Sequence, residues 1–283
     1  MTLLMGAVAY DPKVVTIWDG FRRHFIKHGL PFDYLLYSHY EPQTEDLVAG
    51  RIHAAWNSPL AWIRTRRLAG KAGVTVEALV MRDTDRDLRS LIVVRADSDL
   101  RNLSDLAGRT IATGAIDSPQ ANLLPMSLLR KHDLTPGDNL TVRRFDVGVG
   151  LHGDHIGGER DAARALVAGA VDAACMIDSN HLLFAREGVL PSGSTRILGE
   201  TDPYDHCNMT IGPAADPAEV SRFGSLLSAM SYDDATVRPL LDLEGLKQWC
   251  PGRTSGYAAL DAAVDEVGFY GEDGDVRAAG YRP

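Results

Sequence analysis

The stretch LVAGRIHAAW at residues 47–56 returns as LVAGAVDAAC at residues 166–175, with six of ten positions identical. Each copy is typical of the last turn of a helix, a glycine that ends it, and a short buried strand. Two copies of such a unit predict two similar lobes. Because strands and helices alternate before each copy, we expect an α/β fold with parallel sheets and helices on both faces.

The segments before the two copies repeat the same order of elements. A helix expected over residues 14–28 places the apolar side chains between Val14 and Phe25 on one face, and a second helix is expected over residues 120–132. The strands that precede and follow these helices are expected at residues 3–10, 32–37, 110–113 and 140–145. Both units therefore predict the order strand, helix, strand, helix.

Two crossings between the lobes are expected. The apolar strand at residues 91–95 is the candidate for the first crossing, and the return lies near residues 196–211. Lobe 1 is then built from residues 1–92 plus 207–283, and lobe 2 from residues 93–206, with the ligand cleft between them. The tail at residues 271–283 is rich in glycine and charge, and we expect it to fray.

The composition excludes several classes of protein. With 29 Lys and Arg against 38 Asp and Glu, the net charge is −9, which disfavours nucleic acid and anionic lipid as partners. Three cysteines without a CxxC pair exclude a disulfide scaffold. The apolar runs are too short for membrane insertion, and the start has no basic region typical of a signal peptide. The expected location is cytoplasmic as written, or periplasmic if a leader was removed.

Four motifs follow one another along the chain. They are Gly50-x-Ile-x-Ala-Ala-Trp56-Asn57-Ser58-Pro59, Leu106-Ala107-Gly108-Arg109-Thr110-Ile111-Ala112, Arg160-Asp161-Ala162 and Val171-Asp172-Ala173-Ala174. In this order the chain resembles, over residues 3 to 265, the type II periplasmic binding protein fold and its phosphonate-binding (PhnD-like) solute-binding family of ABC transporters. The resemblance implies a hinged cleft between two lobes, a small-molecule ligand, an ABC permease as partner if the protein is exported, and no required cofactor.

The resemblance also implies a set of ligand-binding positions. They are Tyr10, Asn57, Ser58, Asp117, Ser118, Gln120, Arg160, Asp161 and Asp178. The family's Ser- and Thr-rich turn is here Asp117-Ser118-Pro119-Gln120, and Arg160 replaces the histidine of a His-Asp pair. A carboxylate about 5 Å from a phosphonate dianion repels it by several kcal/mol at intermediate effective dielectric. We therefore expect a small polar ligand other than a simple phosphonate: a neutral, zwitterionic or cationic molecule.

The glycine-rich segment at residues 148–159 supports a second hypothesis. Its GxGxxG pattern lacks the helix that a dinucleotide-binding turn opens, so a loop at the cleft mouth is expected. This loop carries His152 and His155, which together with His206 are candidate ligands for zinc or iron, next to Cys207. The alternative function is a cytosolic enzyme on the binding-protein fold that acts on a small metabolite, with these histidines as ligands if it depends on a metal. The competing interpretation of this segment is a solvated loop of glycine and histidine that binds no metal. The spacing of residues identifies no catalytic residue.

Overall fold

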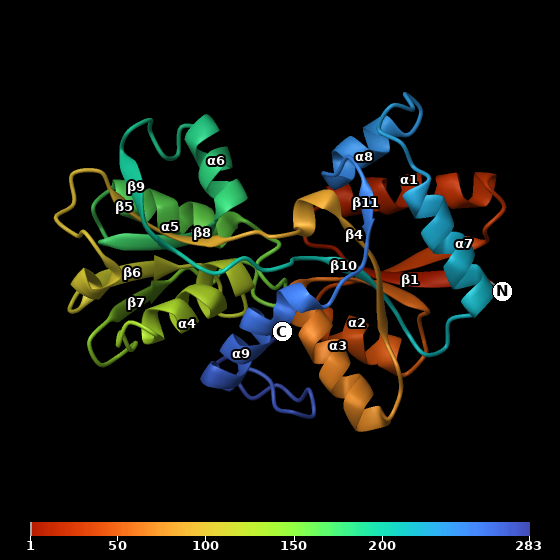
Figure 1. Cartoon of the computed structure of the whole chain (residues 1–283), viewed down its shortest axis with the longest axis horizontal. Helices are drawn as coiled ribbons and strands as arrows, with labels where there is room; N and C mark the ends of the chain where they lie inside the picture. The colour runs from red at the N-terminus through yellow and green to blue at the C-terminus, as the bar shows by residue number, and fades with distance from the viewer. Residues whose placement is uncertain (1) are drawn as a thin grey trace.

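Two sheets lie next to each other along the long axis of the protein in the computed structural model, which describes residues 2–283 (Figure 1). The six-stranded sheet has the order β11-β4-β10-β3-β1-β2. Its strands are β1 (Leu3–Val8), β2 (Phe32–Tyr37), β3 (Ala54–Asn57), β4 (Glu77–Arg82), β10 (Asn208–Ile211) and β11 (Trp249–Pro251). The strands β1, β2 and β3 are parallel, whereas β10 is antiparallel to both of its neighbours.

The five-stranded sheet has the order β7-β6-β8-β5-β9. Its strands are β5 (Ser90–Arg95), β6 (Thr110–Thr113), β7 (Thr141–Arg144), β8 (Ala173–Ile177) and β9 (Thr195–Glu200). The repeated sequence has the same place in both sheets: Ala54 and Ala55 of β3 pair with β1, and Ala173 and Ala174 of β8 pair with β6. The predicted two-lobe α/β fold is confirmed.

The helices cover both faces of each sheet. They are α1 (Lys13–Lys27), α2 (Tyr40–Val48), α3 (Pro59–Ala72), α4 (Leu124–Arg130), α5 (Gly157–Val167), α6 (Asp178–Arg186), α7 (Pro217–Ser228), α8 (Arg238–Glu244) and α9 (Ala258–Val267). Helices α1, α7 and α8 lie on one face of the six-stranded sheet, and α2 and α3 on the other (Figure 1). The apolar face predicted for α1 is buried. No helix among residues 2–283 has the length and apolar character needed to span a bilayer.

The first crossing lies at residues 83–89, before the position expected from the sequence. The strand at residues 91–95 is part of β5, a central strand that pairs with β8 and β9. The expected boundary after residue 92 therefore falls inside a strand of the second sheet. The return crossing at residues 201–207 lies within its expected range, and the two crossings are joined by a backbone bridge between Leu88 and Tyr204.

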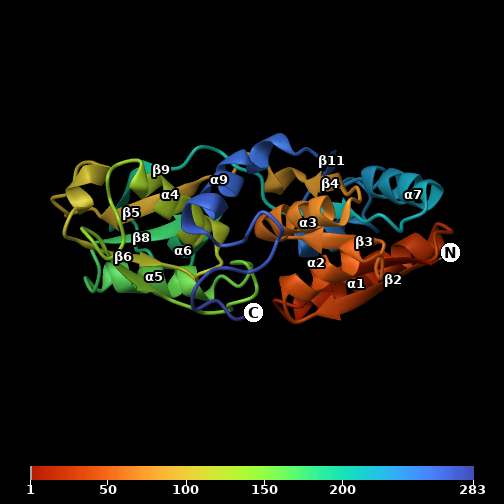
Figure 2. The same ribbon diagram turned by 90° about the horizontal axis from the view of Figure 1, so that it is seen from below.

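The tail at residues 271–283 was expected to fray, but the structure places it and the preceding helix in ordered contact with the rest of the chain. Helix α9 packs its Leu260 and Val264 against residues of both lobes, including Ile63 of α3 and Leu124 of α4. The chain after α9 lies between the lobes (Figure 2), and Tyr281 is fully buried. This segment therefore bridges the lobes.

Candidate functional site

A cavity of about 390 Å³ lies between the lobes, and we call it the interlobe cavity. The first lobe and the crossings contribute residues that follow strand ends, and the second lobe contributes its glycine-rich loop and the starts of two helices. The lining includes Tyr10, Lys13, Arg82, Asp85, Gln120, Asp154, Ser179, Asn180 and His206. Ligands of open α/β sheets bind at such strand ends, so the cavity is the candidate binding site.

Arg82 dominates the electrostatics of the first wall, but its charge is already balanced. Its guanidinium donates to both carboxylate oxygens of Asp85, at 2.6 and 2.8 Å. A third nitrogen lies 3.4 Å from Oε1 of Glu244. Burial raises the pKa of Glu244 to about 7. The charge of Arg82 is thus largely compensated inside the protein.

The opposite wall offers acceptors. Tyr40 donates a short hydrogen bond to Asp154, and burial raises the pKa of Asp154 above its ordinary value. The side-chain nitrogen of Gln120 donates to the carbonyl of Gly153 at 2.9 Å, while its Oε1 has no partner among the described residues. On the first wall, burial lowers the pKa of His206, which favours the neutral imidazole beside Asp85. These groups suit a ligand that brings hydrogen-bond donors.

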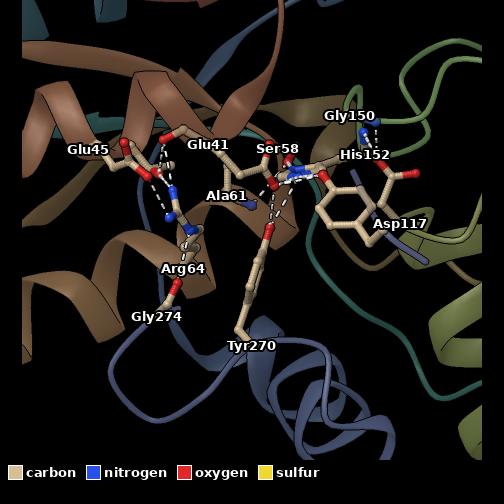
Figure 3. A network of polar contacts seen from close by, with 12 residues as sticks. Glu41, Glu45, Ser58, Ala61, Arg64, Asp117, Gly150, His152, Tyr270 and Gly274 are labelled. Carbon is tan, nitrogen blue, oxygen red and sulfur yellow. Dashed lines mark hydrogen bonds and ion pairs between the residues drawn. The ribbon is translucent and has the colours of Figure 1, made fainter. Parts of the chain in front are cut away.

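Beside the cavity, one imidazole joins the two lobes (Figure 3). His152, from the loop between β7 and α5, is fully buried. Its Nδ1 lies 2.7 Å from Oγ of Ser58, and its Nε2 lies 3.0 Å from Oε1 of Glu41. Tyr270 and Tyr281 donate to the same Glu41 oxygen, each at 2.7 Å. We call these five residues the latch, because His152 comes from the second lobe and its partners from the first lobe and the C-terminal segment.

Asp117 holds the backbone of the loop between β7 and α5 that carries His152, which we call the latch loop. One oxygen of this carboxylate accepts the N–H groups of Gly150 and His152, at 2.7 and 3.0 Å. Burial raises the pKa of Asp117. Gly150 has a φ of 91°, which glycine adopts without strain, and His152 has a φ of 50°, a left-handed conformation that is uncommon for a residue other than glycine. Asp117 therefore orders the loop and does not line the cavity.

The comparisons with known proteins agree with this architecture. The family model described as "ABC transporter, phosphonate, periplasmic substrate-binding protein" matches residues 8–257. The chain belongs to this family. Helix α9 and the segment with Tyr270 and Tyr281 lie beyond the matched residues.

Solved structures share the fold at low sequence identity. PhnD1 from Prochlorococcus marinus, in complex with methylphosphonate, is 13% identical with a TM-score of 0.70, covering 94% of this chain and 98% of that one. XAC2383 from Xanthomonas citri, bound to ATP, is 20% identical with a TM-score of 0.69, covering 94% and 97%. SsuA from Escherichia coli, an aliphatic sulphonate binding protein, is 15% identical with a TM-score of 0.56, covering 94% and 86%.

The structure divides the expected ligand-binding residues of this family member into groups. Tyr10 and Gln120 line the interlobe cavity. Ser58 and Ser118 are N-caps that accept hydrogen bonds from Ala61 and Ala121, each at 3.1 Å. Both are buried, as is Asp117. The caps place two helix starts at the cleft but leave no side-chain surface for a solute.

The remaining positions lie outside the cavity lining. Asn57 is buried and donates to Thr65 and Thr210 within the first lobe. Arg160 forms a short ion pair with Glu187, and Asp161 pairs with Arg164 on α5. Asp178 accepts the backbone N–H groups of Arg89 and Ser179 at the start of α6; its neighbours Ser179 and Asn180 line the cavity instead.

The three histidines proposed as metal ligands are not brought together. His152 is in the latch, and the exposed His155 accepts the N–H of Gly157 at 3.3 Å. His206 lies 3.1 Å from Sγ of Cys207 and 3.7 Å from Asp85. These three residues are the one group of His, Cys, Asp and Glu side chains within residues 2–283 whose ligand atoms lie close enough together to hold a metal ion. The carboxylate of Asp85 is already bound by the guanidinium of Arg82. Because this positive charge repels a metal ion, the three residues fit a metal poorly.

Sequence reasoning missed the latch partners Glu41, Tyr270 and Tyr281. The imidazole of His152 lies between the Ser58 hydroxyl and the Glu41 carboxylate, as the histidine does in a Ser-His-acid triad. In this conformation, however, the Ser58 hydroxyl is buried and caps α3, which leaves no room for a substrate carbonyl. The arrangement is a contact between lobes.

Proposed function

We propose that this protein binds a zwitterionic solute, and not a simple phosphonate, in the interlobe cavity. The observation that carries this proposal is the engagement of Arg82 by Asp85 and Glu244. A phosphonate dianion needs uncompensated donors, and Arg82 has little charge left to offer it. Lys13 lines the cavity and makes no ion pair among the described residues.

A zwitterion suits Asp154 and Lys13, which form no ion pair among the described residues. Its cationic end is placed against the carboxylate of Asp154, and its anionic end against Lys13. The cationic end favours the ionised form of Asp154, whose pKa burial raises, and Lys13 also faces Glu244. The relatives solved with methylphosphonate and ATP hold anions, so this chain would have kept the fold and changed the charge of the ligand.

Binding of defined probes tests the proposal. Glycine betaine (a zwitterion), putrescine (a dication) and methylphosphonate are titrated by calorimetry, together with native mass spectrometry for a molecule retained through purification. Binding of glycine betaine, with at least tenfold loss of affinity in Asp154→Asn and none in Asp161→Asn, supports it, whereas binding of putrescine without glycine betaine contradicts the zwitterionic class. Micromolar binding of methylphosphonate contradicts it.

We further propose that the protein acts in the periplasm and delivers its solute to an ABC permease, as its family membership supports. Cell fractionation of the source organism with an antibody tests the location. Release with the periplasmic fraction is expected, and retention with the cytoplasm contradicts this proposal. Crosslinking to a membrane complex in the presence of the solute tests the partner.

A further inference from the structure

The partners of His152 form a box around its imidazole ring. Tyr40 stacks on the ring, with centroids 4.6 Å apart and planes at 16°. Glu41 and Ser58 face the two ring nitrogens. The hydroxyls of Tyr270 and Tyr281 lie 3.3 and 3.4 Å from Nε2. We call these five surrounding residues the imidazole box.

All five members of the box belong to the first lobe or the C-terminal segment. Tyr40 and Glu41 begin α2, Ser58 caps α3, and the two tyrosines follow α9. The ring that fills the box is attached to the second lobe. The ring is covalently attached to the second lobe through the latch loop, whereas the contacts described above join it to the first lobe and the C-terminal segment. The ring therefore occupies the box as a bound ligand would.

Two further observations favour a binding site over ordinary packing. Ser58 stands directly after β3, at a strand end where α/β proteins bind ligands. Glu41 is 4% exposed, and its Oε2 has no hydrogen-bond partner among the described residues. Buried acceptors are normally satisfied, so the box holds an acceptor that the ring of His152 leaves unused.

We propose that the imidazole box is a binding site for planar nitrogen heterocycles of the imidazole type, and that His152 fills it as a tethered ligand that holds the lobes closed. The class follows from the geometry: a flat ring for Tyr40, and two nitrogens on opposite sides for Ser58 and Glu41. The box is separate from the lining of the interlobe cavity, so the proposal does not rest on the identity of the solute.

Removing the tethered ring and supplying it in free form tests the site. The His152→Ala variant is melted with imidazole at 0 to 100 mM, and with pyrazole as the matched control, because pyrazole has the same size but adjacent nitrogens. We expect imidazole to raise the Tm of the variant by several degrees and pyrazole to leave it unchanged. Wild-type protein, whose box is filled, is expected not to respond.

A second readout tests the tether. Small-angle scattering is expected to give a larger radius of gyration for His152→Ala than for the wild type, with or without imidazole, because the free ring fills the box without linking the lobes. His155→Ala, in the same loop but exposed, is expected to match the wild type. An unchanged radius of gyration in folded His152→Ala overturns the tether.

A further variant keeps the proposal falsifiable if His152→Ala does not fold. Asp117→Ala removes the oxygen that accepts the N–H groups of Gly150 and His152 and leaves the box intact, so it is expected to gain a Tm response to imidazole that the wild type lacks. The double variant His152→Ala/Glu41→Gln is expected to lose the response. If the folded variants ignore imidazole, or respond equally to pyrazole, the box is not a heterocycle site.

Discussion

Glu159 is a single buried carboxyl whose proton affects the stability of the whole protein. Its Oε2 accepts the N–H of Ile177 at 3.0 Å and the side-chain amide of Asn180 at 2.9 Å. Burial raises the pKa of Glu159 to about 7, from an ordinary value of 4.5. The folded protein therefore binds this proton more tightly than the unfolded chain does. Stability is fully present below pH 4.5 and decreases as the pH rises towards 7.

The Glu159→Gln variant is expected to remove this decrease, because its amide oxygen still accepts both hydrogen bonds and carries no charge. At pH 8 its free energy of unfolding should exceed that of the wild type by up to about 3 kcal/mol, and at pH 4.5 the difference should be small. Urea unfolding at both pH values measures it. Asp161→Asn, on the same helix and partly exposed, serves as the control. An effect of Glu159→Gln that does not change with pH contradicts this account.

Glu41 shows the opposite shift. Burial alone would raise the pKa of Glu41, but His152 and the hydroxyls of Tyr281 and Tyr270 outweigh it and lower the pKa to about 2. A depressed pKa stabilises the folded protein above pH 4.5, and this contribution is lost as the pH falls from 4.5 towards 2.

Glu41→Gln is therefore expected to lower the free energy of unfolding at pH 7 by about 2 to 3 kcal/mol, and to lose less stability than the wild type between pH 4.5 and pH 3. Chemical unfolding across this pH range measures both effects. Tyr281→Phe, which removes one donor to the same oxygen, should give a smaller change in the same direction. Equal acid sensitivity of Glu41→Gln and the wild type would show that another group controls it.

At the scale of elements, the repeated sequence offers a matched pair of glycines. Gly50 and Gly169 end equivalent helices with φ values of 73° and 72°. A Cβ at Gly169 meets nothing within 4 Å, whereas one at Gly50 lies 2.9 Å from Cβ of Ala214. Gly169→Ala is expected to cost about 1 kcal/mol for the left-handed backbone alone, and Gly50→Ala to cost more. Urea unfolding of the two variants compares them, and equal losses would contradict the steric difference.

Local sequence patterns predicted the helices and strands well, but they predicted less well which strands pair with one another in a sheet. The apolar face of α1 and the glycine stops are set by residues close in sequence. The apolar run in β5 indicated a strand buried on both faces, but the sheet to which it belongs depends on β8 and β9, which lie far along the chain. The crossing was therefore misplaced by a few residues, although both lobes were predicted.

At the scale of the whole molecule, the candidate site was predicted only in part, because its contacts join distant segments. The family resemblance implied Tyr10 and Gln120, which line the interlobe cavity. Glu41 lies 111 positions from His152, 229 from Tyr270 and 240 from Tyr281. No spacing rule reaches across such distances. The glycines and charges of the tail at residues 271–283 indicated fraying, whereas Tyr281 within the tail and Tyr270 just before it provide buried hydroxyls.

The bridging position of α9 predicts how the lobes unfold. Leu260 is fully buried and packs in one cluster with residues of both lobes, so the lobes are expected to unfold in one calorimetric transition. Leu260→Ala removes part of this shared core and is expected to cost about 2 to 4 kcal/mol. Because the loss falls on the contact between lobes, it should separate the transition into two. Leu182→Ala, at a side chain that is 66% exposed, should keep one transition near the wild-type Tm. A single transition in Leu260→Ala, shifted to lower temperature, would mean that the crossings and the latch couple the lobes without α9.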